Sequence, residues 1–159
     1  MKHTLINQIF IEMNNQPFVI ERLYDAPAAR VWKAITSRDE MKQWYFDLSG
    51  FKAEPGFEFT FNGEGRKGEK YVHLCKITEV IEGKKLSYSW AYEGFPGKSE
   101  VTFELFPEGS KTRLRLTHAG LETFLQSNSD FARESFAEGW NYITGTALKD
   151  FVEKAGVKS

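Results

Sequence analysis

The chain has 159 residues, of which 41% are hydrophobic and 15% are aromatic, and 14 of them are phenylalanine. This length fits one domain and can bury a core without disulfides or metals. The formal net charge of −1 gives no reason to expect a nucleic acid or an anionic membrane surface as a partner. The aromatic content implies a core or a cavity that is walled by rings.

The N-terminal segment and the cysteine content bear on the location of the protein. Residues 1–16 are treated as an N-terminal extension, because their apolar residues follow no clean period; a strand, a short helix and an oligomer contact all stay open. Glu12 and a polar run stand where a signal peptide would have its apolar region. Cys75 is the single cysteine, so no internal disulfide is implied. No run reaches the ~20 apolar residues that cross a bilayer. We therefore expect a cytoplasmic protein without a membrane partner.

A strand followed by two short helices is expected at the start of the domain, which we place at residues 17–156. Phe18 to Tyr24 is rich in β-forming residues. Asp25 stands before Pro27, where it is expected to cap a first helix. Ser37 and Glu40 have the spacing of a capping box for a second helix. The apolar positions of the two helices are Val31, Trp32, Ile35, Met41, Trp44 and Tyr45.

Between residues 51 and 118 the apolar residues alternate with period two, which is typical of strands with one buried face. Short turns separate consecutive runs, at residues 62–65, 82–84, 94–97 and 107–110. The run from Tyr71 to Ile81 has an open register, because two adjacent apolar residues break its alternation. The inward positions of the other runs are Phe57, Phe59, Phe61, Leu86, Tyr88, Trp90, Val101, Phe103, Leu105, Leu114, Leu116 and His118. This order predicts an antiparallel meander.

A long helix is predicted from Asp130, which is expected to cap it, to Gly156. Its apolar stripe consists of Phe136, Trp140, Ile143, Ala147 and Phe151. A helix of about 25 residues spans roughly 37 Å, enough to cross a sheet. Since neither the stripe nor the sheet face can stay in water, we predict that the two pack together. The expected fold is α+β: a curved antiparallel sheet with the long helix across its concave face.

Several segments resemble the START-like, or SRPBCC, superfamily, and within it the family named after the activator of the heat-shock protein 90 ATPase. These segments are residues 21–27, 31–36, 42–44, 55–59, 84–90, 112–114, 116–118 and 139–140. Phe57 stands where the family pattern carries a second glycine. The resemblance covers about residues 18–155 and implies a helix-grip fold over a cavity. The superfamily includes lipid and steroid carriers, plant hormone and allergen proteins, polyketide cyclases and the chaperone activator.

A ligand cavity between helix and sheet is the candidate site. Tyr88, Trp90 and Trp140 offer rings with a polar atom, which suits a mixed apolar ligand. The candidate lining residues are Trp44, Phe59, Phe61, Tyr88, Trp90, Phe103, His118, Phe136 and Trp140. A solid core would use the same residues. His118 fits either a ligand or acid–base contact or a structural hydrogen bond, and His73 can face either side of the sheet.

Three functions fit the sequence. The first is non-enzymatic binding of a small hydrophobic or aromatic molecule. The second is a cyclase- or hydrolase-like enzyme that uses His118 with a carboxylate such as Glu79 or Glu122. The third is a stress-related co-chaperone; it is the weaker expectation, because the eukaryotic activator has a separate N-terminal domain for which 159 residues leave no room. No catalytic residue, cofactor or metal site is assigned, since three histidines and one cysteine lack ligand spacing. A homodimer stays open.

Overall fold

The computed structural model describes residues 16–48 and 50–158, with side chains as far as Lys154. Apart from Gln16, the predicted N-terminal extension lies outside these residues. Six antiparallel strands form one sheet in the order β1-β6-β5-β4-β3-β2. The strands are β1 (Phe18–Tyr24), β2 (Glu58–Glu64), β3 (Lys70–Ile81), β4 (Lys85–Tyr92), β5 (Ser99–Glu108) and β6 (Lys111–Ala119).

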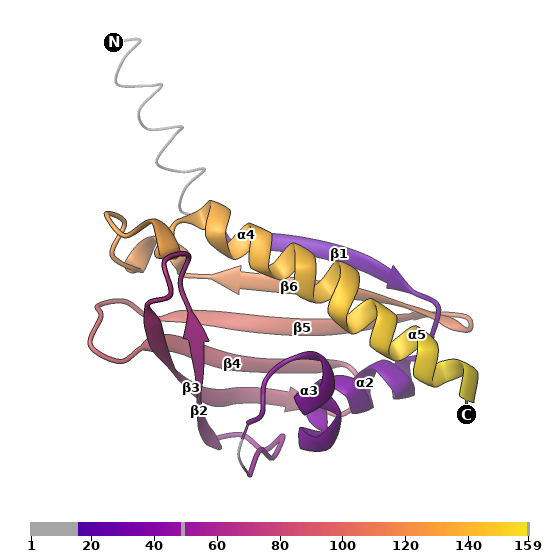
Figure 1. The fold of residues 1–159 in the computed structure, drawn as a ribbon. Coiled ribbons are helices and arrows are strands. Elements are labelled where there is room, and N and C mark those ends of the chain that lie inside the picture. The colour runs from indigo at the N-terminus through magenta and orange to yellow at the C-terminus, as the bar shows by residue number, and fades with distance from the viewer. Residues whose placement is uncertain (1–15, 49, 159) are drawn as a thin grey trace, which may run out of the picture.

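Helices cover one face of this sheet (Figure 1). Two short helices follow the first strand, α2 (Ala28–Thr36) and α3 (Arg38–Trp44). The C-terminal helix consists of α4 (Arg133–Tyr142), a π-helical segment (Ile143–Ala147) and α5 (Leu148–Lys158), and it crosses the sheet obliquely. Two short 3-10 turns precede it, at Leu121–Thr123 and Ser129–Phe131. The predicted architecture of curved sheet, two short helices and long C-terminal helix is confirmed. In the part of the chain that is described, no helix combines the length and apolarity needed to cross a membrane.

The buried face of the sheet follows from the alternation of the sequence. In β6, for example, Leu114, Leu116 and His118 are fully buried, while the residues between them are partly exposed. The open register of β3 is explained by a β-bulge, because the pairing with β4 shifts between Ile77 and Glu79. The extra residue moves the apolar positions after it by one, which is why the alternation breaks near the end of the strand.

Helix α2 begins later than a cap at Asp25 requires. Pro27 occupies the cap position in an extended conformation and makes no side-chain cap bond. Because a capping residue directly precedes its helix, the predicted Asp25 cap is wrong. Asp25 instead meets the C-terminal helix, where its backbone N–H donates to Oε2 of Glu153 at 2.9 Å.

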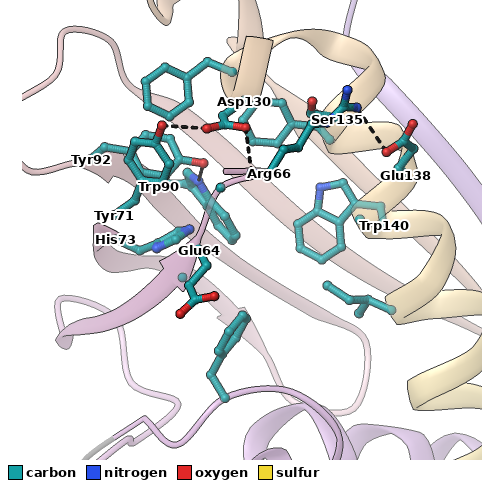
Figure 2. A pocket seen from close by; sticks show the side chains of 17 residues that line it. Glu64, Arg66, Tyr71, His73, Trp90, Tyr92, Asp130, Ser135, Glu138 and Trp140 are labelled. Atoms are coloured by element: carbon teal, nitrogen blue, oxygen red, sulfur yellow. Dashed lines mark hydrogen bonds and ion pairs between the residues drawn. The ribbon is translucent and has the colours of Figure 1, made fainter. Parts of the chain in front are cut away.

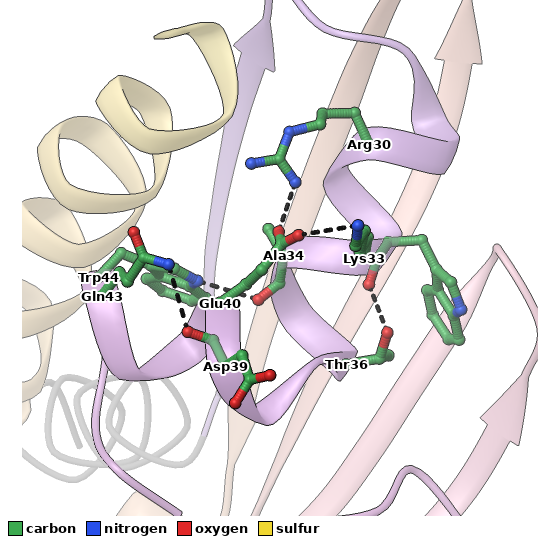
Figure 3. A network of polar contacts seen from close by, with 9 residues as sticks. Arg30, Lys33, Ala34, Thr36, Asp39, Glu40, Gln43 and Trp44 are labelled. Carbon is green, nitrogen blue, oxygen red and sulfur yellow. Dashed lines mark hydrogen bonds and ion pairs between the residues drawn. The ribbon is translucent and has the colours of Figure 1, made fainter. Parts of the chain in front are cut away.

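Helix α3 is tied to α2 by side-chain contacts rather than by the predicted capping box (Figure 3). Ser37 precedes α3 but makes no side-chain cap bond, so the capping-box prediction is wrong. Glu40 forms an ion pair with Arg30 of α2, which takes its carboxylate away from the helix terminus. The indole Nε1 of Trp44 donates to the carbonyl of Ala34 at 2.9 Å. These contacts fix the helix pair at one end of the sheet.

The C-terminal helix differs from prediction at both ends. Ala132 is the residue at its N-terminal cap position and makes no side-chain cap bond, so the predicted Asp130 cap is wrong. Asp130 lies in the preceding 3-10 turn, where its backbone N–H donates to the side chain of Asn128 at 2.9 Å. Gly156 does not end the helix, because α5 continues to Lys158.

Candidate functional site

A pocket of about 480 Å³ lies between the C-terminal helix and the end of the sheet formed by β2, β3 and β4 (Figure 2). Its apolar wall is made of Phe46, Trp90, Phe131, Phe136, Trp140 and Ile143. Its polar side chains are Glu64, Arg66, Tyr71, His73, Tyr92, Asp130, Ser135 and Glu138. The pocket is therefore an aromatic hollow whose polar groups lie both at the exposed rim and among the buried rings.

Three glycines shape this pocket. A Cβ on Gly63 would lie 2.7 Å from Cε1 of His73, and one on Gly65 would collide with the carboxylate of Asp130. Only a residue without a side chain lets these two groups approach the hairpin between β2 and β3 so closely. Gly139 differs, because a Cβ there would meet no heavy atom within 4 Å. Its missing side chain leaves open space at the edge of the pocket.

The rim joins segments that are far apart in sequence. Arg66 in the β2–β3 turn pairs with Glu138 of α4, with 3.1 Å between Nη2 and Oε2. The backbone N–H of Arg66 donates to Oδ1 of Asp130 at 3.1 Å, and the hydroxyl of Tyr71 donates to Oδ2 at 2.7 Å. The hydrogen bond from Tyr71, followed by the one from Arg66, holds the pKa of Asp130 below its ordinary value.

The buried end of the pocket contains His73 and Tyr92. The side chain of His73 stacks on Phe61, with ring centroids 4.2 Å apart, and Nδ1 lies 3.3 Å from the carbonyl oxygen of Phe61. Burial lowers the pKa of His73 from 6.5 to about 4, so the ring is neutral at pH 7. The indole Nε1 of Trp90 donates to the hydroxyl oxygen of Tyr92 at 2.9 Å.

His118 is fully buried behind the pocket wall and has partners on both ring nitrogens. Nε1 of Trp140 donates to its Nδ1 at 3.0 Å, and its Nε2 lies 2.8 Å from Oγ of Ser99. Since an indole N–H can only donate, Nδ1 carries no proton, and Nε2–H donates to Ser99. The Ser99 hydroxyl in turn donates to the carbonyl of Trp90 at 2.9 Å. This arrangement supports the structural role considered for His118.

Three of the nine residues expected at a ligand cavity line this pocket: Trp90, Phe136 and Trp140. Tyr92 and His73 were not among the nine, although both could have been found. Tyr92 continues the alternation of β4 beyond Trp90, and His73 belongs to the same alternation in β3. No sequence pattern indicates the ion pair of Arg66 with Glu138 at the rim, because the two residues lie 72 positions apart.

The other candidates lie elsewhere in the core. Trp44, Tyr88 and Phe103 border a second void of about 10 Å³, which is near the ~10–15 Å³ that a single water needs. Phe59 packs edge-to-face against Tyr88 at 5.2 Å, and Phe61 forms the ring stack under His73. These five side chains fill space between sheet and helices.

The carboxylates considered as partners for a catalytic histidine are also remote from the pocket. Glu79 forms an ion pair with Lys85, with 2.8 Å between Oε1 and Nζ, and Glu122 is exposed. Neither lines the pocket. Among residues 16–48 and 50–158, no three histidine, cysteine, aspartate or glutamate side chains come together in an arrangement that could hold a metal ion.

Solved structures share this architecture. CalU16 from Micromonospora echinospora is 29% identical with a TM-score of 0.68, and the match covers 86% of this chain and 73% of that one. Protein MLL2253 from Mesorhizobium loti is 26% identical with a TM-score of 0.67, covering 87% and 98%. Protein CV1439 from Chromobacterium violaceum, at 19% identity, TM-score 0.72 and coverage of 86% and 96%, shows likeness of fold alone.

The sequence itself matches a protein family over residues 25–153, which is most of the chain. The description of that family is "Activator of Hsp90 ATPase homolog 1-like protein". A search of curated proteins found no match. The resemblance stated from the sequence motifs is confirmed, and the chain belongs to the activator of Hsp90 ATPase homolog 1-like family.

Proposed function

We propose that this protein binds a small hydrophobic or aromatic molecule in the pocket, without transforming it chemically. The observation that carries the proposal is the combination of volume and lining. About 480 Å³ falls within the ~300–1,000 Å³ of typical small-molecule sites, and most of the apolar wall is aromatic. Trp90 and Trp140 face this space with ring centroids 5.7 Å apart. A flat apolar molecule that packs against these two rings would bury apolar surface on the face that it presents to them.

A carrier role is favoured over catalysis by the state of His118. Both of its ring nitrogens are engaged, and burial lowers its pKa from 6.5 to about 3. A general acid or base works best with a pKa near the operating pH and within reach of the substrate proton. His118 meets neither condition, because it is neutral at pH 7 and lies behind Trp140.

The test is a variant that occupies the pocket without removing an existing contact. Gly139→Leu is suitable, because the position opens on free space and leucine favours a helix by ~0.5–1 kcal/mol over glycine. We expect the native protein to be stabilised by hydrophobic probes in a thermal-shift screen, by about 2.7 kcal/mol at 100 times the dissociation constant. We expect Gly139→Leu to fold and to lose this response.

The matched control is Thr146→Leu, which adds the same side chain at an exposed position of the same helix outside the pocket. Native mass spectrometry of the purified protein would identify any co-purifying molecule. Binding that persists in Gly139→Leu at native affinity would contradict the pocket as the site. A screen of lipids and aromatics in which the native protein responds to none would contradict the function.

A further inference from the structure

Tyr92 places an unused hydrogen-bond donor at the pocket. Its side chain is 6% exposed and lines the pocket beside Trp90 (Figure 2). The hydroxyl oxygen accepts from the indole of Trp90, which can only donate. In the hydrogen bonds of the described chain, the hydroxyl proton of Tyr92 has no acceptor. Burial raises the pKa of Tyr92, so the proton stays on the oxygen at pH 7.

His73 places an unused acceptor next to it. Its side chain is 8% exposed and also lines the pocket, and its ring centroid lies 4.8 Å from that of Tyr92. The carbonyl oxygen of Phe61 lies 3.3 Å from Nδ1 and can only accept, so we assign the proton of the neutral ring to Nδ1. Nε2 is then an acceptor, and no side chain or backbone group of residues 16–48 and 50–158 donates to it.

We propose that the pocket selects apolar or aromatic molecules that carry a neutral hydroxyl group, which accepts a hydrogen bond from Tyr92 and donates one to Nε2 of His73. This inference rests on the proposed function and names the class of its ligand. A hydroxyl group is the simplest ligand group that donates and accepts at one atom. A ligand hydroxyl that hydrogen-bonds to both groups gains free energy from each bond, so it binds more tightly than a ligand of the same shape that bonds to neither.

The charges at the rim support a neutral group over an anionic one. Glu64, Asp130 and Glu138 border the pocket, against the single cation Arg66. Arg66 is already paired with Glu138. A carboxylate ligand would therefore meet a rim of like charge, with no unpaired cation among the lining residues to compensate it.

The experiment uses two pairs of probes on the native protein, with dissociation constants from isothermal titration calorimetry. 2-Naphthol and 2-methylnaphthalene have nearly the same size. The hydroxyl of 2-naphthol can accept from Tyr92 and donate to His73, whereas the methyl group can do neither. 2-Methoxynaphthalene and 2-ethylnaphthalene differ only in the ability to accept. At about fivefold per hydrogen bond, we expect roughly 25-fold tighter binding of 2-naphthol in the first pair and ~fivefold tighter binding of the ether in the second.

Two variants assign the effect to residues. Because Tyr92→Phe alone would free the indole N–H of Trp90 to bond the probe, the substitution is made in a Trp90→Phe background. Relative to Trp90→Phe, the double variant loses only the hydroxyl, so the second pair should become equal and the first pair should differ by only ~fivefold. Tyr88→Phe is the matched control, because its buried hydroxyl bonds to Tyr45 and it does not line this pocket. Tyr88→Phe should leave the ratio of dissociation constants within each probe pair unchanged.

The outcomes separate this inference from the proposed function. If all four probes bind with equal affinity, the hydroxyl preference is refuted while ligand binding stands, and water satisfies Tyr92 and His73. If 2-naphthol is preferred equally in Trp90→Phe and in the double variant Trp90→Phe/Tyr92→Phe, the assignment to Tyr92 is refuted. If none of the four probes binds, the proposed function itself fails.

Discussion

The indole of Trp140 and the hydroxyl of Ser99 hold His118 in a single neutral tautomer. The indole N–H of Trp140 donates to Nδ1 of His118, Nε2–H of His118 donates to Ser99, and the Ser99 hydroxyl donates to the carbonyl of Trp90. Each donor in this chain of hydrogen bonds therefore has one acceptor. Such a network is stable only while every member is satisfied. A second proton on His118 would leave Nδ1–H facing the N–H of Trp140.

Because two histidines are buried in their neutral form, we expect the folded protein to lose stability in acid. Burial lowers the pKa of His118 to about 3 and that of His73 to about 4, from 6.5. The unfolded chain therefore binds more protons than the folded one below pH 6.5, and stability falls as the pH drops from 6.5 toward 4. Each histidine contributes a slope of about 1.4 kcal/mol per pH unit in this window.

Urea unfolding at pH 7.5, 6.5 and 5.0 measures the effect. The midpoint should hardly change between pH 7.5 and 6.5 and should fall clearly by pH 5.0. Above pH 5 the change in stability comes mainly from the histidines, because unperturbed carboxylates titrate at about pH 4. An equal midpoint at all three pH values would show that neither ring is buried in its neutral form.

At the scale of elements, the π-helical segment determines which face of the C-terminal helix is buried. The predicted stripe continued from Trp140 to Ile143, Ala147 and Phe151, but these three are only partly buried. The buried positions are instead four residues apart throughout: Phe136, Trp140, Thr144, Leu148 and Val152. A regular helix of 3.6 residues per turn cannot keep this spacing on one face, whereas a wider turn restores the register.

The wider turn is held by contacts to β1. The hydroxyl of Tyr24 donates to the backbone carbonyl of Thr144 at 2.7 Å, and Nε of Arg22 donates to Oγ1 of Thr144 at 3.3 Å. The hydroxyl of Thr144 donates to the carbonyl of Trp140 at 2.7 Å. The sheet therefore supplies hydrogen bonds to groups in this part of the helix.

Leu148→Ala tests this register. Leu148 is 0% exposed, so we expect a loss of about 2–5 kcal/mol in the free energy of unfolding, because the substitution leaves a cavity. The matched control is Leu125→Ala, the same change at a residue that is 42% exposed, with an expected effect within ~0.5 kcal/mol. Equal losses in urea unfolding would mean that residue 148 lies at the flank of the helix, as in the predicted stripe.

At the scale of the whole molecule, Asp130 connects the two walls of the pocket. Its carboxylate accepts hydrogen bonds from the backbone N–H of Arg66 in the β2–β3 turn and from the hydroxyl of Tyr71 in β3. Its backbone belongs to the 3-10 turn before α4. The exposed ion pair of Arg66 with Glu138 makes a second connection. Exposed ion pairs contribute little, so we infer that Asp130 is the stronger link.

Hydrogen exchange checks this inference. Asp130→Ala should speed exchange in the β2–β3 turn, residues 64–69, while exchange in β5 and β6 keeps its native rate. Arg66→Gln removes only the ion pair and should change the free energy of unfolding by no more than ~0.5 kcal/mol. Turn peptides that exchange at the same rate in Asp130→Ala and in the native protein would argue against a hinge at this residue.

Much of the fold was predictable because its signals are local. Period-two alternation marked the strands between residues 58 and 119, except at the bulge near the end of β3, and the return to a period near 3.6 marked the long helix. Both patterns depend on residues within a few positions of each other. The caps expected at Asp25, Ser37 and Asp130 failed for the opposite reason. Asp25, Glu40 and Asp130 make contacts across the fold, and a sequence pattern does not contain them.

The sequence by itself thus determined the family, the sheet with its buried face, and the aromatic character of the space beneath the long helix. Only the tertiary structure decided that Trp44, Tyr88 and Phe103 border a void of about 10 Å³, whereas Trp90, Phe136 and Trp140 border a pocket of about 480 Å³. The physical reason is that alternation fixes the side of the sheet on which a ring lies, whereas an open volume depends on distances between segments. Here those distances are set by the widened helical turn, by the glycines of the β2–β3 hairpin, and by Asp130.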